Sequence, residues 1–425
     1  MEAIFLFGLF LILLMLSVPI GYAIGMVTLV TMLEFTSMPT LMIAQNSIAG
    51  VDSFPLLAIP FFMLAGNLMS GGGIAKRLVN FFECFIGHIT GGLGMVTIVV
   101  CMFFAAISGS AVATVSAVGA FMIPQMVEHG YSKPFSAALT AAAGTIGVII
   151  PPSVPFVIYG VVSGASITNL FTAGFLPGVL MGIALMIVCY IVSKKRGYRG
   201  STEKASFEKI VRTFKDAIWA ILSPVIILGG IYSGKFTPTE AAVVSVVYSY
   251  IVGRFVYKEL DASTTYKSLK DAIVINGATT FMVGLSTAFA ALLTMEQIPL
   301  KIAAFITGIS NNGVIILLMV NLFLLIVGMF IDNIPATIIL TPILLPICKK
   351  FGMSPITFGI MLTMNLAIGF CTPPYGIGHF QSEDGSPVQR TDPIDRRTAG
   401  RTGFRNLYPG CHHHIPEIRR RVHLC

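Results

Sequence analysis

The sequence predicts an all-α polytopic membrane protein with two inverted repeats, each containing a re-entrant helical hairpin and a helix broken by a Pro-Pro pair. Composition gives the first indication of this fold class. Hydrophobic residues make up 55% of the 425 residues, charged residues only 11%, and the mean hydropathy is +0.86. Soluble domains carry about 25% charged residues. A soluble globular protein is therefore excluded.

Apolar stretches long enough to enter or cross a hydrocarbon core of roughly 30 Å recur along the chain. The first has no basic n-region and no evident cleavage site, so we expect a retained helix that Pro19 kinks, not a signal peptide. The ten stretches are 3–33, 55–69, 94–126, 135–163, 171–193, 216–233, 237–256, 271–294, 314–348 and 355–371.

Basic residues cluster in loops beside these stretches, which is typical of membrane orientation signals and not of a nucleic-acid surface. The run at 194–215, "KKRGYRGSTEKASFEKIVRTFK", is the strongest cytoplasmic marker. The seven cysteines include no CxxC pair, so we expect packing residues and no metal cluster.

An internal repeat is the third observation. The segment "PQMVEHGYSKPFSAALTAAAGTIGVIIPPSVPF" aligns with "PICKKFGMSPITFGIMLTMNLAIGFCTPPYGIG" at a constant offset of 222 residues. Upstream, with a one-residue gap, Ala113-Thr114 matches Ala336-Thr337. The identities across the constant offset pair Pro124, Gly130, Ser132, Gly147, Pro151 and Pro152 with Pro346, Gly352, Ser354, Gly369, Pro373 and Pro374.

Each repeat begins with an overlong apolar stretch that has a polar centre. We interpret "SGS" at 108–110 and "DNIP" at 332–335 as the tips of re-entrant hairpins. Counting outward from the basic loop, the first hairpin opens to the cytoplasm and the second to the opposite side. The basic residues agree, because only Lys235, Lys301, Lys349 and Lys350 fall on the far side before position 377.

The broken helices predict a cation site. A proline lacks the N–H that would bond the carbonyl four residues earlier, and a free carbonyl is costly at membrane depth unless protein, water or an ion meets it. Unwound carbonyls hold Na⁺ or H⁺ in transporters with inverted repeats, and the oxygens at the hairpin tips suit a hard cation. The candidate sodium ligands are Ser108, Gly109, Ser110, Gly147, Val148, Pro151, Asp332, Asn333, Gly369, Phe370, Thr372 and Pro373.

An anionic substrate is expected beside the cation, because helices begin at each tip and after each Pro-Pro pair, and helix N-termini attract anions. The candidate substrate-binding residues are Ser110, Ser153, Asn333, Thr372 and Asn67.

Structural roles remain open for several of these residues. Asp332 could only cap the returning hairpin arm, the small residues of 108–110 could serve helix packing, and Asn67 could lie away from the site. "FTPTEA" at 236–241 is interpreted as a structural capping box.

These segments also suggest a family. "SFPLLAIPFFMLAGNLM", "SGSAVATVSAVGAFMIP", "IPPSVPFVIYG", "SGKFTPTEAA", "GMFIDNIPATIILTPILLP" and "NLAIGFCTPPYG" occur in this order. Residues 3–377 thus resemble the large membrane subunit of a TRAP (tripartite ATP-independent periplasmic) transporter of the DctM type.

The resemblance implies a multi-pass protein of the bacterial inner membrane that imports small carboxylates or acidic sugars such as sialic acid. It implies sodium coupling without an organic cofactor, and an elevator movement of a transport domain against a scaffold. The partners would be a small four-helix membrane subunit (DctQ-like), encoded separately, and a periplasmic substrate-binding protein (DctP-like).

Five regions follow. Residues 1–93 would form N-terminal scaffold and arm segments, 94–163 the first hairpin and broken helix of the transport domain, 164–313 scaffold helices with the basic loop, and 314–377 the second hairpin and broken helix. Residues 378–425 depart from the family.

That tail contains no Lys, eight Arg and five of the seven His, whereas residues 1–377 contain 14 Lys and five Arg. Our hypothesis is an out-of-frame translation, with His412–His414 not a metal site and the chain inactive as written; a genuine polar tail is the alternative.

Three other functions compete. A sodium-coupled carboxylate carrier without a binding protein is the closest alternative, and a channel is a second. An enzyme is disfavoured, because Asp332 is the one acid in the middle of an apolar segment.

Overall fold

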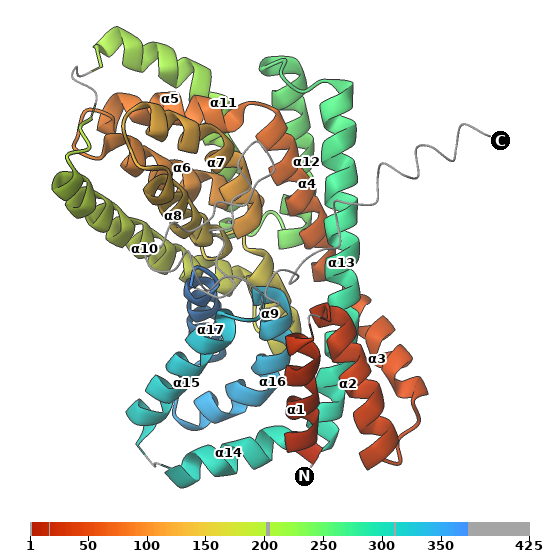
Figure 1. Cartoon of the computed structure of the whole chain (residues 1–425). Helices are drawn as coiled ribbons and strands as arrows, with labels where there is room; N and C mark the ends of the chain where they lie inside the picture. Colours follow the sequence, from red (N-terminus) through yellow and green to blue (C-terminus); the bar gives the residue numbers. More distant parts are fainter. Residues whose placement is uncertain (1, 17, 201–204, 310–311, 373–425) are drawn as a thin grey trace, which may run out of the picture.

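The computed structural model describes residues 2–16, 18–200, 205–309 and 312–372, and over this part of the chain it is all-helical (Figure 1). Short 3-10 helices η1 (Phe54–Leu57) and η2 (Thr145–Val148) and a π-helical turn, η3 (Val252–Val256), interrupt the α-helices. The α-helices are α1 (Glu2–Met15), α2 (Ile20–Phe35), α3 (Leu41–Val51), α4 (Ala58–Gly71), α5 (Ile74–Ile86), α6 (Gly92–Ser108), α7 (Ala111–Glu128), α8 (Lys133–Gly144), α9 (Val154–Ser163), α10 (Ile167–Arg196), α11 (Phe207–Tyr232), α12 (Pro238–Ile251), α13 (Ala262–Met295), α14 (Ile298–Ile309), α15 (Gly313–Gly328), α16 (Asn333–Lys350) and α17 (Pro355–Phe370).

The helices form two halves that the long helix α13 connects along one side (Figure 1). The half drawn uppermost contains α5–α8 and most of α10 and α11, and the lower half contains α1–α3 and α14–α16. Each half has its own cluster of buried apolar side chains. Within the described residues, six helical segments are long and apolar enough to cross a membrane, which agrees with the polytopic fold expected from the sequence.

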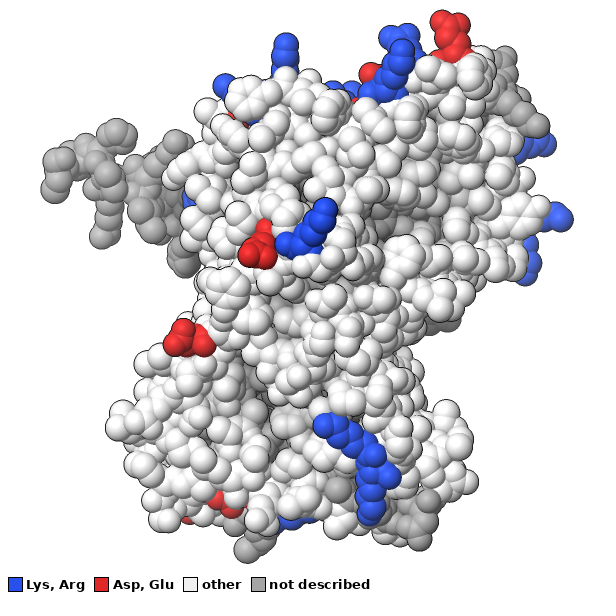
Figure 2. All heavy atoms as spheres, turned by 180° about the vertical axis from the view of Figure 1, so that it is seen from behind, with Lys and Arg blue, Asp and Glu red and all other residues white. Residues whose placement is uncertain are grey.

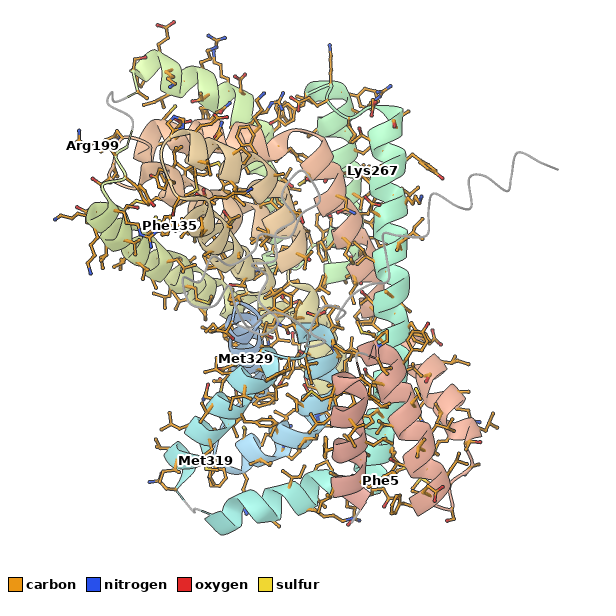
Figure 3. All side chains as sticks on the ribbon, viewed as in Figure 1. Phe5, Phe135, Arg199, Lys267, Met319 and Met329 are labelled. Carbon is orange, nitrogen blue, oxygen red and sulfur yellow. The ribbon has the colours of Figure 1, made fainter. Side chains whose placement is uncertain are left out.

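The two hairpins enter from opposite ends of the molecule, as predicted. Helices α6 and α7 lie in the upper half and meet at Gly109, whereas α15 and α16 lie in the lower half and meet between Met329 and Asp332 (Figure 1). Met329 lies at the junction of the two halves (Figure 3). The repeats are therefore inverted.

Charged side chains gather at one end of the molecule. Figure 2 shows most of the Lys and Arg over the end that carries α5, α10 and α11, with large uncharged areas elsewhere. Helix α10 ends there in Lys194, Lys195 and Arg196, and Arg199 follows at the same end (Figure 3). This arrangement is the one expected for a cytoplasmic end.

The first apolar stretch differs from expectation. It is a hairpin of two short helices, α1 and α2, and not one kinked helix. The rings of Phe5 and Phe35 lie 4.8 Å apart, so the start of α1 meets the end of α2. Pro19 is the N-cap of α2. With 14 and 16 residues, each helix is about 21–24 Å long, which is less than a hydrocarbon core of about 30 Å.

Three helices lie outside the ten predicted stretches: α3, α5 and α14. Each has only 11–13 residues, too few to stand out as a membrane span. The capping box at Thr237 is confirmed, because the Thr237 side chain accepts from the Glu240 N–H while Glu240 accepts from the Thr237 N–H at 2.8 Å.

Candidate functional site

The first hairpin tip is a small network of hydroxyl groups. Gly109 ends α6 in the left-handed conformation (φ +61°), and Ser110 caps α7 by accepting from the Ala113 N–H at 3.4 Å. The buried Ser108 hydroxyl lies 3.0 Å from the Thr114 hydroxyl, which donates to the Ser110 carbonyl at 2.8 Å. Two hydroxyls and a carbonyl thus meet at the expected tip.

The broken helix of the first repeat contacts this tip directly. The chain unwinds after η2, passes a cis Pro151-Pro152 bond and restarts as α9. The Val154 N–H donates to the Gly109 carbonyl at 3.1 Å. A Cβ on Gly147 would lie 2.8 Å from Thr114 Oγ1 and 2.9 Å from the Ser110 carbonyl oxygen. The predicted ligands of the first repeat are therefore brought together.

The two carbonyls released by the prolines have different surroundings. The fully buried Ser153 hydroxyl donates to the Val148 carbonyl at 2.6 Å and caps α9 by accepting from the Phe156 N–H. In a regular helix the Gly147 carbonyl would accept from the N–H of residue 151, but that residue is Pro151, which has no N–H. The preceding N–H, that of Ile150, donates to the Ile146 carbonyl. The Val148 carbonyl thus already accepts a hydrogen bond from Ser153, whereas Pro151 has no N–H to donate to the Gly147 carbonyl.

The second tip is built around Asp332, the N-cap of α16. Its Oδ1 accepts from the Asn333 N–H at 2.7 Å. The capping role considered from the sequence is therefore present, and a carboxylate also stands at the tip. The buried Asn333 accepts through Oδ1 from the Thr337 hydroxyl at 3.3 Å, and Thr337 repeats the place of Thr114 in the other half.

Asn333 also presents an unpaired donor. Its side chain is only 6% exposed, and its Nδ2 has no hydrogen-bond partner among the described residues. A buried amide without a partner costs about 1–3 kcal/mol. Since an NH₂ group donates and cannot ligate a cation, this atom fits an anion or another acceptor, while Oδ1 faces Thr337.

The second unwound segment is described as far as Thr372; Pro373 and Pro374 lie outside the described residues. The Gly369 carbonyl accepts from the Thr372 hydroxyl at 2.6 Å and from its N–H at 2.8 Å. A Cβ on Gly369 would lie 2.8 Å from the Gly328 Cα, so α17 crosses the end of α15 at two glycines. Phe370 ends α17 at this level.

The two repeats touch at the middle of the molecule. Val148, the last residue of η2, and Ile149 of the first unwound segment pack with Ala367 of α17. The buried Tyr159 of α9 donates to the Pro355 carbonyl, at the start of α17, at 2.6 Å. Each broken helix is therefore packed against the other repeat.

Asn67 is placed elsewhere. Its side chain donates to the Ser268 carbonyl of α13 at 3.4 Å, and the Ser268 hydroxyl donates back to the Asn67 carbonyl at 3.4 Å. The adjacent Gly66 faces the tip instead, because a Cβ there would lie 2.9 Å from the Ser108 Cβ. The residue that contacts the tip is therefore Gly66, the neighbour of the predicted Asn67.

A polar pair that the sequence analysis missed joins the arms of the second repeat. Asn365 of α17 donates to Asn321 of α15 at 2.7 Å. The only sequence signal was two amides within apolar runs. Among the described residues no cluster of three or more His, Cys, Asp or Glu occurs, so a cation at the tips would rely on hydroxyl, amide, carbonyl and Asp332 oxygens.

Inverted hairpins and broken helices that meet at oxygen-rich tips between the two halves are typical of multi-pass membrane proteins of the secondary-transporter class. Comparison with known proteins identifies the family. The profile described as "Tripartite ATP-independent periplasmic transporter, DctM component" matches residues 7–392. The chain belongs to this family of transporter permeases, which confirms the resemblance seen in the sequence.

Individual relatives agree. The isethionate TRAP transporter permease protein DctMQ of Oleidesulfovibrio alaskensis is 46% identical over 375 residues, covering 88% of this chain and 59% of that protein. This chain therefore spans about three fifths of that relative. The sialic acid TRAP transporter large permease protein SiaM of Vibrio cholerae is 42% identical over 86% of this chain and 85% of its own length. The C4-dicarboxylate TRAP transporter large permease protein DctM of Pseudomonas aeruginosa is 40% identical over 84% of both.

The fold is similar to that of a solved transporter. The crystal structure of the YdaH transporter of Alcanivorax borkumensis superposes with a TM-score of 0.56 over 87% of this chain and 88% of that one, at 13% sequence identity. At this identity the likeness concerns the fold alone.

Proposed function

We propose that this chain is the membrane permease subunit of a sodium-coupled, binding-protein-dependent importer of small organic anions in a bacterial inner membrane. Family membership supports a permease, and relatives named for sialic acid, C4-dicarboxylates and isethionate support an acidic substrate. Its partners would be a small four-helix membrane subunit and a periplasmic substrate-binding protein.

The observation that carries the proposal is the meeting of the first tip with the first unwound segment. One cation would take oxygens from Ser108, Ser110 and Gly147, with Gly109, Val148 and Pro151 forming the surrounding backbone. A second cation would take oxygens from Asp332, Asn333 Oδ1, Phe370 and Thr372 in the other repeat, with Gly369 forming the surrounding backbone because its carbonyl already accepts from Thr372. Hydroxyl, amide and carbonyl oxygens are ordinary ligands of hard cations.

The anion would lie between the helix N-termini. Those of α7 and α9 are adjacent, since Val154 of α9 bonds to Gly109, and free N–H groups with the helix dipole favour negative charge there. The candidate polar contacts are Ser110, Ser153, Thr372 and Asn333, whose Nδ2 has no hydrogen-bond partner among the described residues. Movement of the two packed repeats as one unit against the remaining helices would expose the site alternately.

Sodium coupling is tested by uptake into proteoliposomes that contain the small membrane subunit and a form of this chain in which an apolar continuation follows Pro374, with the binding protein and radiolabelled anions outside. We expect uptake to require an inward Na⁺ gradient and the binding protein, and Ser108→Ala to raise the Na⁺ concentration for half-maximal uptake. Uptake without the binding protein would instead favour the independent carrier, and a resolvable single-channel current would favour a channel.

We further propose that the chain is inactive as written. Helix α9 of the first repeat packs against α16 of the second repeat. On α16, Ile339 and Ile343 are buried and at most 5% exposed. Helix α7 is the first-repeat equivalent of α16, and its corresponding face is exposed instead. This face includes Val112, which is 58% exposed. The counterpart of α9 would follow Pro374, where the sequence turns polar.

The test compares this chain with one in which an apolar continuation follows Pro374. We expect uptake only from the restored form, and equal uptake from both forms would show that the tail does not disable the protein. The gene around codons 370–385, translated in all three frames, shows whether such a continuation exists.

A further inference from the structure

The first ten residues of α11 extend beyond its membrane-spanning part. No charged residue occurs between Asp216 and Lys235, and these 18 residues of mostly helical chain are about 27 Å long, close to the roughly 30 Å hydrocarbon core. Phe207–Asp216 therefore adds about 15 Å of helix to this apolar part. Figure 1 places the start of α11 at the end of the molecule where Figure 2 shows most of the charged side chains.

This extension has two distinct exposed faces. Phe207, Val211 and Phe214, spaced by four and three residues, form an apolar stripe in which Phe207 is 81% exposed. Arg212 and Lys215, spaced by three residues, lie on an adjoining face, and both are exposed. A shallow groove there is lined by Phe207, Glu208, Val211, Arg212 and Lys215.

Neither Arg212 nor Lys215 forms a salt bridge with any described residue, although Glu208 and Asp216 belong to the same helix. Towards its C-terminal end the extension packs on α5: the ring of Phe214, the last residue of the stripe, lies 5.7 Å from that of Phe81, and Thr213 contacts Cys84. These contacts with α5 fix the position of the groove, in which Arg212 and Lys215 lie beside the apolar stripe.

We propose that this groove, named here the α11 groove, binds an anionic phospholipid of the adjoining leaflet. The phosphate would lie against Arg212 and Lys215 and the glycerol and upper acyl chains along Phe207 and Val211. An amphipathic helix with basic residues at its edge suits a headgroup layer, and each juxtamembrane Lys or Arg strengthens binding to anionic lipid by about 1 kcal/mol, or about fivefold. Glu208 contributes one negative charge at one end of the groove, so the two positive charges of Arg212 and Lys215 make the net charge of its lining positive.

The chain contains a natural fluorophore near this groove. Trp219 is the only tryptophan of the sequence and is 43% exposed. It follows Lys215 by one turn and lies on the same side of α11, one turn deeper towards the core. Acyl chains of a lipid held by Arg212 and Lys215 would pass Trp219.

The test is quenching of Trp219 fluorescence in the full chain, purified in detergent and titrated with phosphatidylglycerol or phosphatidylcholine carrying dibrominated acyl chains. We expect half-maximal quenching at a markedly lower concentration of phosphatidylglycerol. Arg212→Gln with Lys215→Gln should weaken the phosphatidylglycerol response about 25-fold, towards that of phosphatidylcholine. Lys349→Gln with Lys350→Gln makes the same change of charge at the other end and should leave it unchanged.

Four results would overturn the proposal. They are equal quenching by both lipids, an equal effect of the two double variants, full competition by inorganic phosphate at the same concentration, or no quenching by either lipid. The last result would mean that no lipid acyl chain reaches Trp219. Because the four substituted side chains are all exposed, loss of folding does not confuse the comparison, and circular dichroism checks it.

Discussion

Replacement of Gly109 by alanine is the sharpest test of the contact between the first tip and the broken helix. Gly109 has φ +61°, and an added Cβ would lie 2.6 Å from the Pro152 carbonyl oxygen and 3.3 Å from the Val154 nitrogen. Both neighbours are backbone atoms, so the tip and the unwound segment would have to separate. The hydrogen bond from Val154 to the Gly109 carbonyl would be stretched.

The magnitude follows from three effects. Alanine in the left-handed conformation costs about 1–2 kcal/mol, overpacking adds about 1–3 kcal/mol, and a weakened hydrogen bond adds about 1 kcal/mol. Gly164→Ala is the matched control. Gly164 also has positive φ (+71°), but nothing lies within 4 Å of the added Cβ. It should therefore show only the first effect.

The measurement is unfolding of the two variants and the parent chain by sodium dodecyl sulfate in mixed micelles, followed by far-UV circular dichroism. We expect Gly109→Ala to lower the free energy of unfolding by about 2–4 kcal/mol more than Gly164→Ala does. Equal losses would refute the close approach of Gly109 to Pro152, because the backbone conformation alone would then explain both.

The remaining predictions concern contacts between helices and one helix cap. Tyr159→Phe removes the 2.6 Å bond to the Pro355 carbonyl and should lower the free energy of unfolding by about 1 kcal/mol. A double-mutant cycle with Asn321→Leu and Asn365→Leu should give a coupling energy of about 0.6 kcal/mol, and at most about 1.7 kcal/mol. Hydrogen bonds from Thr264 lower the pKa of Asp261. Its stabilisation is therefore present above about pH 4 and lost as pH falls through the lowered pKa, a loss that Asp261→Asn should remove from the acid limb of a thermal-stability profile.

Each of these has a contradicting outcome. Tyr232→Phe, whose hydroxyl bond to Phe171 is 3.3 Å long, should cost less than Tyr159→Phe, and the reverse order would contradict the geometry of Tyr159. A coupling energy of zero would mean that Asn321 and Asn365 do not pair. An unchanged acid limb in the Asp261 variant would show that its cap does not titrate with folding.

The hairpin tips were predictable because their signals are local. A polar centre inside a long apolar stretch, or a proline pair, marks a break whatever surrounds it, and the repeat at a constant offset supplied a second copy of each. The capping box at Thr237 was predictable for the same reason, since all its groups lie within four residues.

Features that depend on neighbouring helices were not predictable. Asn67 lies on the side of α4 that faces α13, because α4 packs between the first tip and α13. Gly66, one position earlier, is the residue that faces the tip. The first apolar stretch has a length that fits one long helix or two short ones. Its folding back at Pro19 is decided by the packing of α1 and α2 on each other and on α13.

That short hairpin also fixes where the two ends of the stretch emerge. Because Phe5 and Phe35 are neighbours, α1 and α2 each enter the membrane partway from the same side, and the stretch 3–33 does not cross it. A topology map that counts it as one crossing would assign its two ends to different compartments. A reporter enzyme fused ahead of Glu2 and the same enzyme inserted at Met38 should therefore face the same compartment, opposite to one inserted at Arg199.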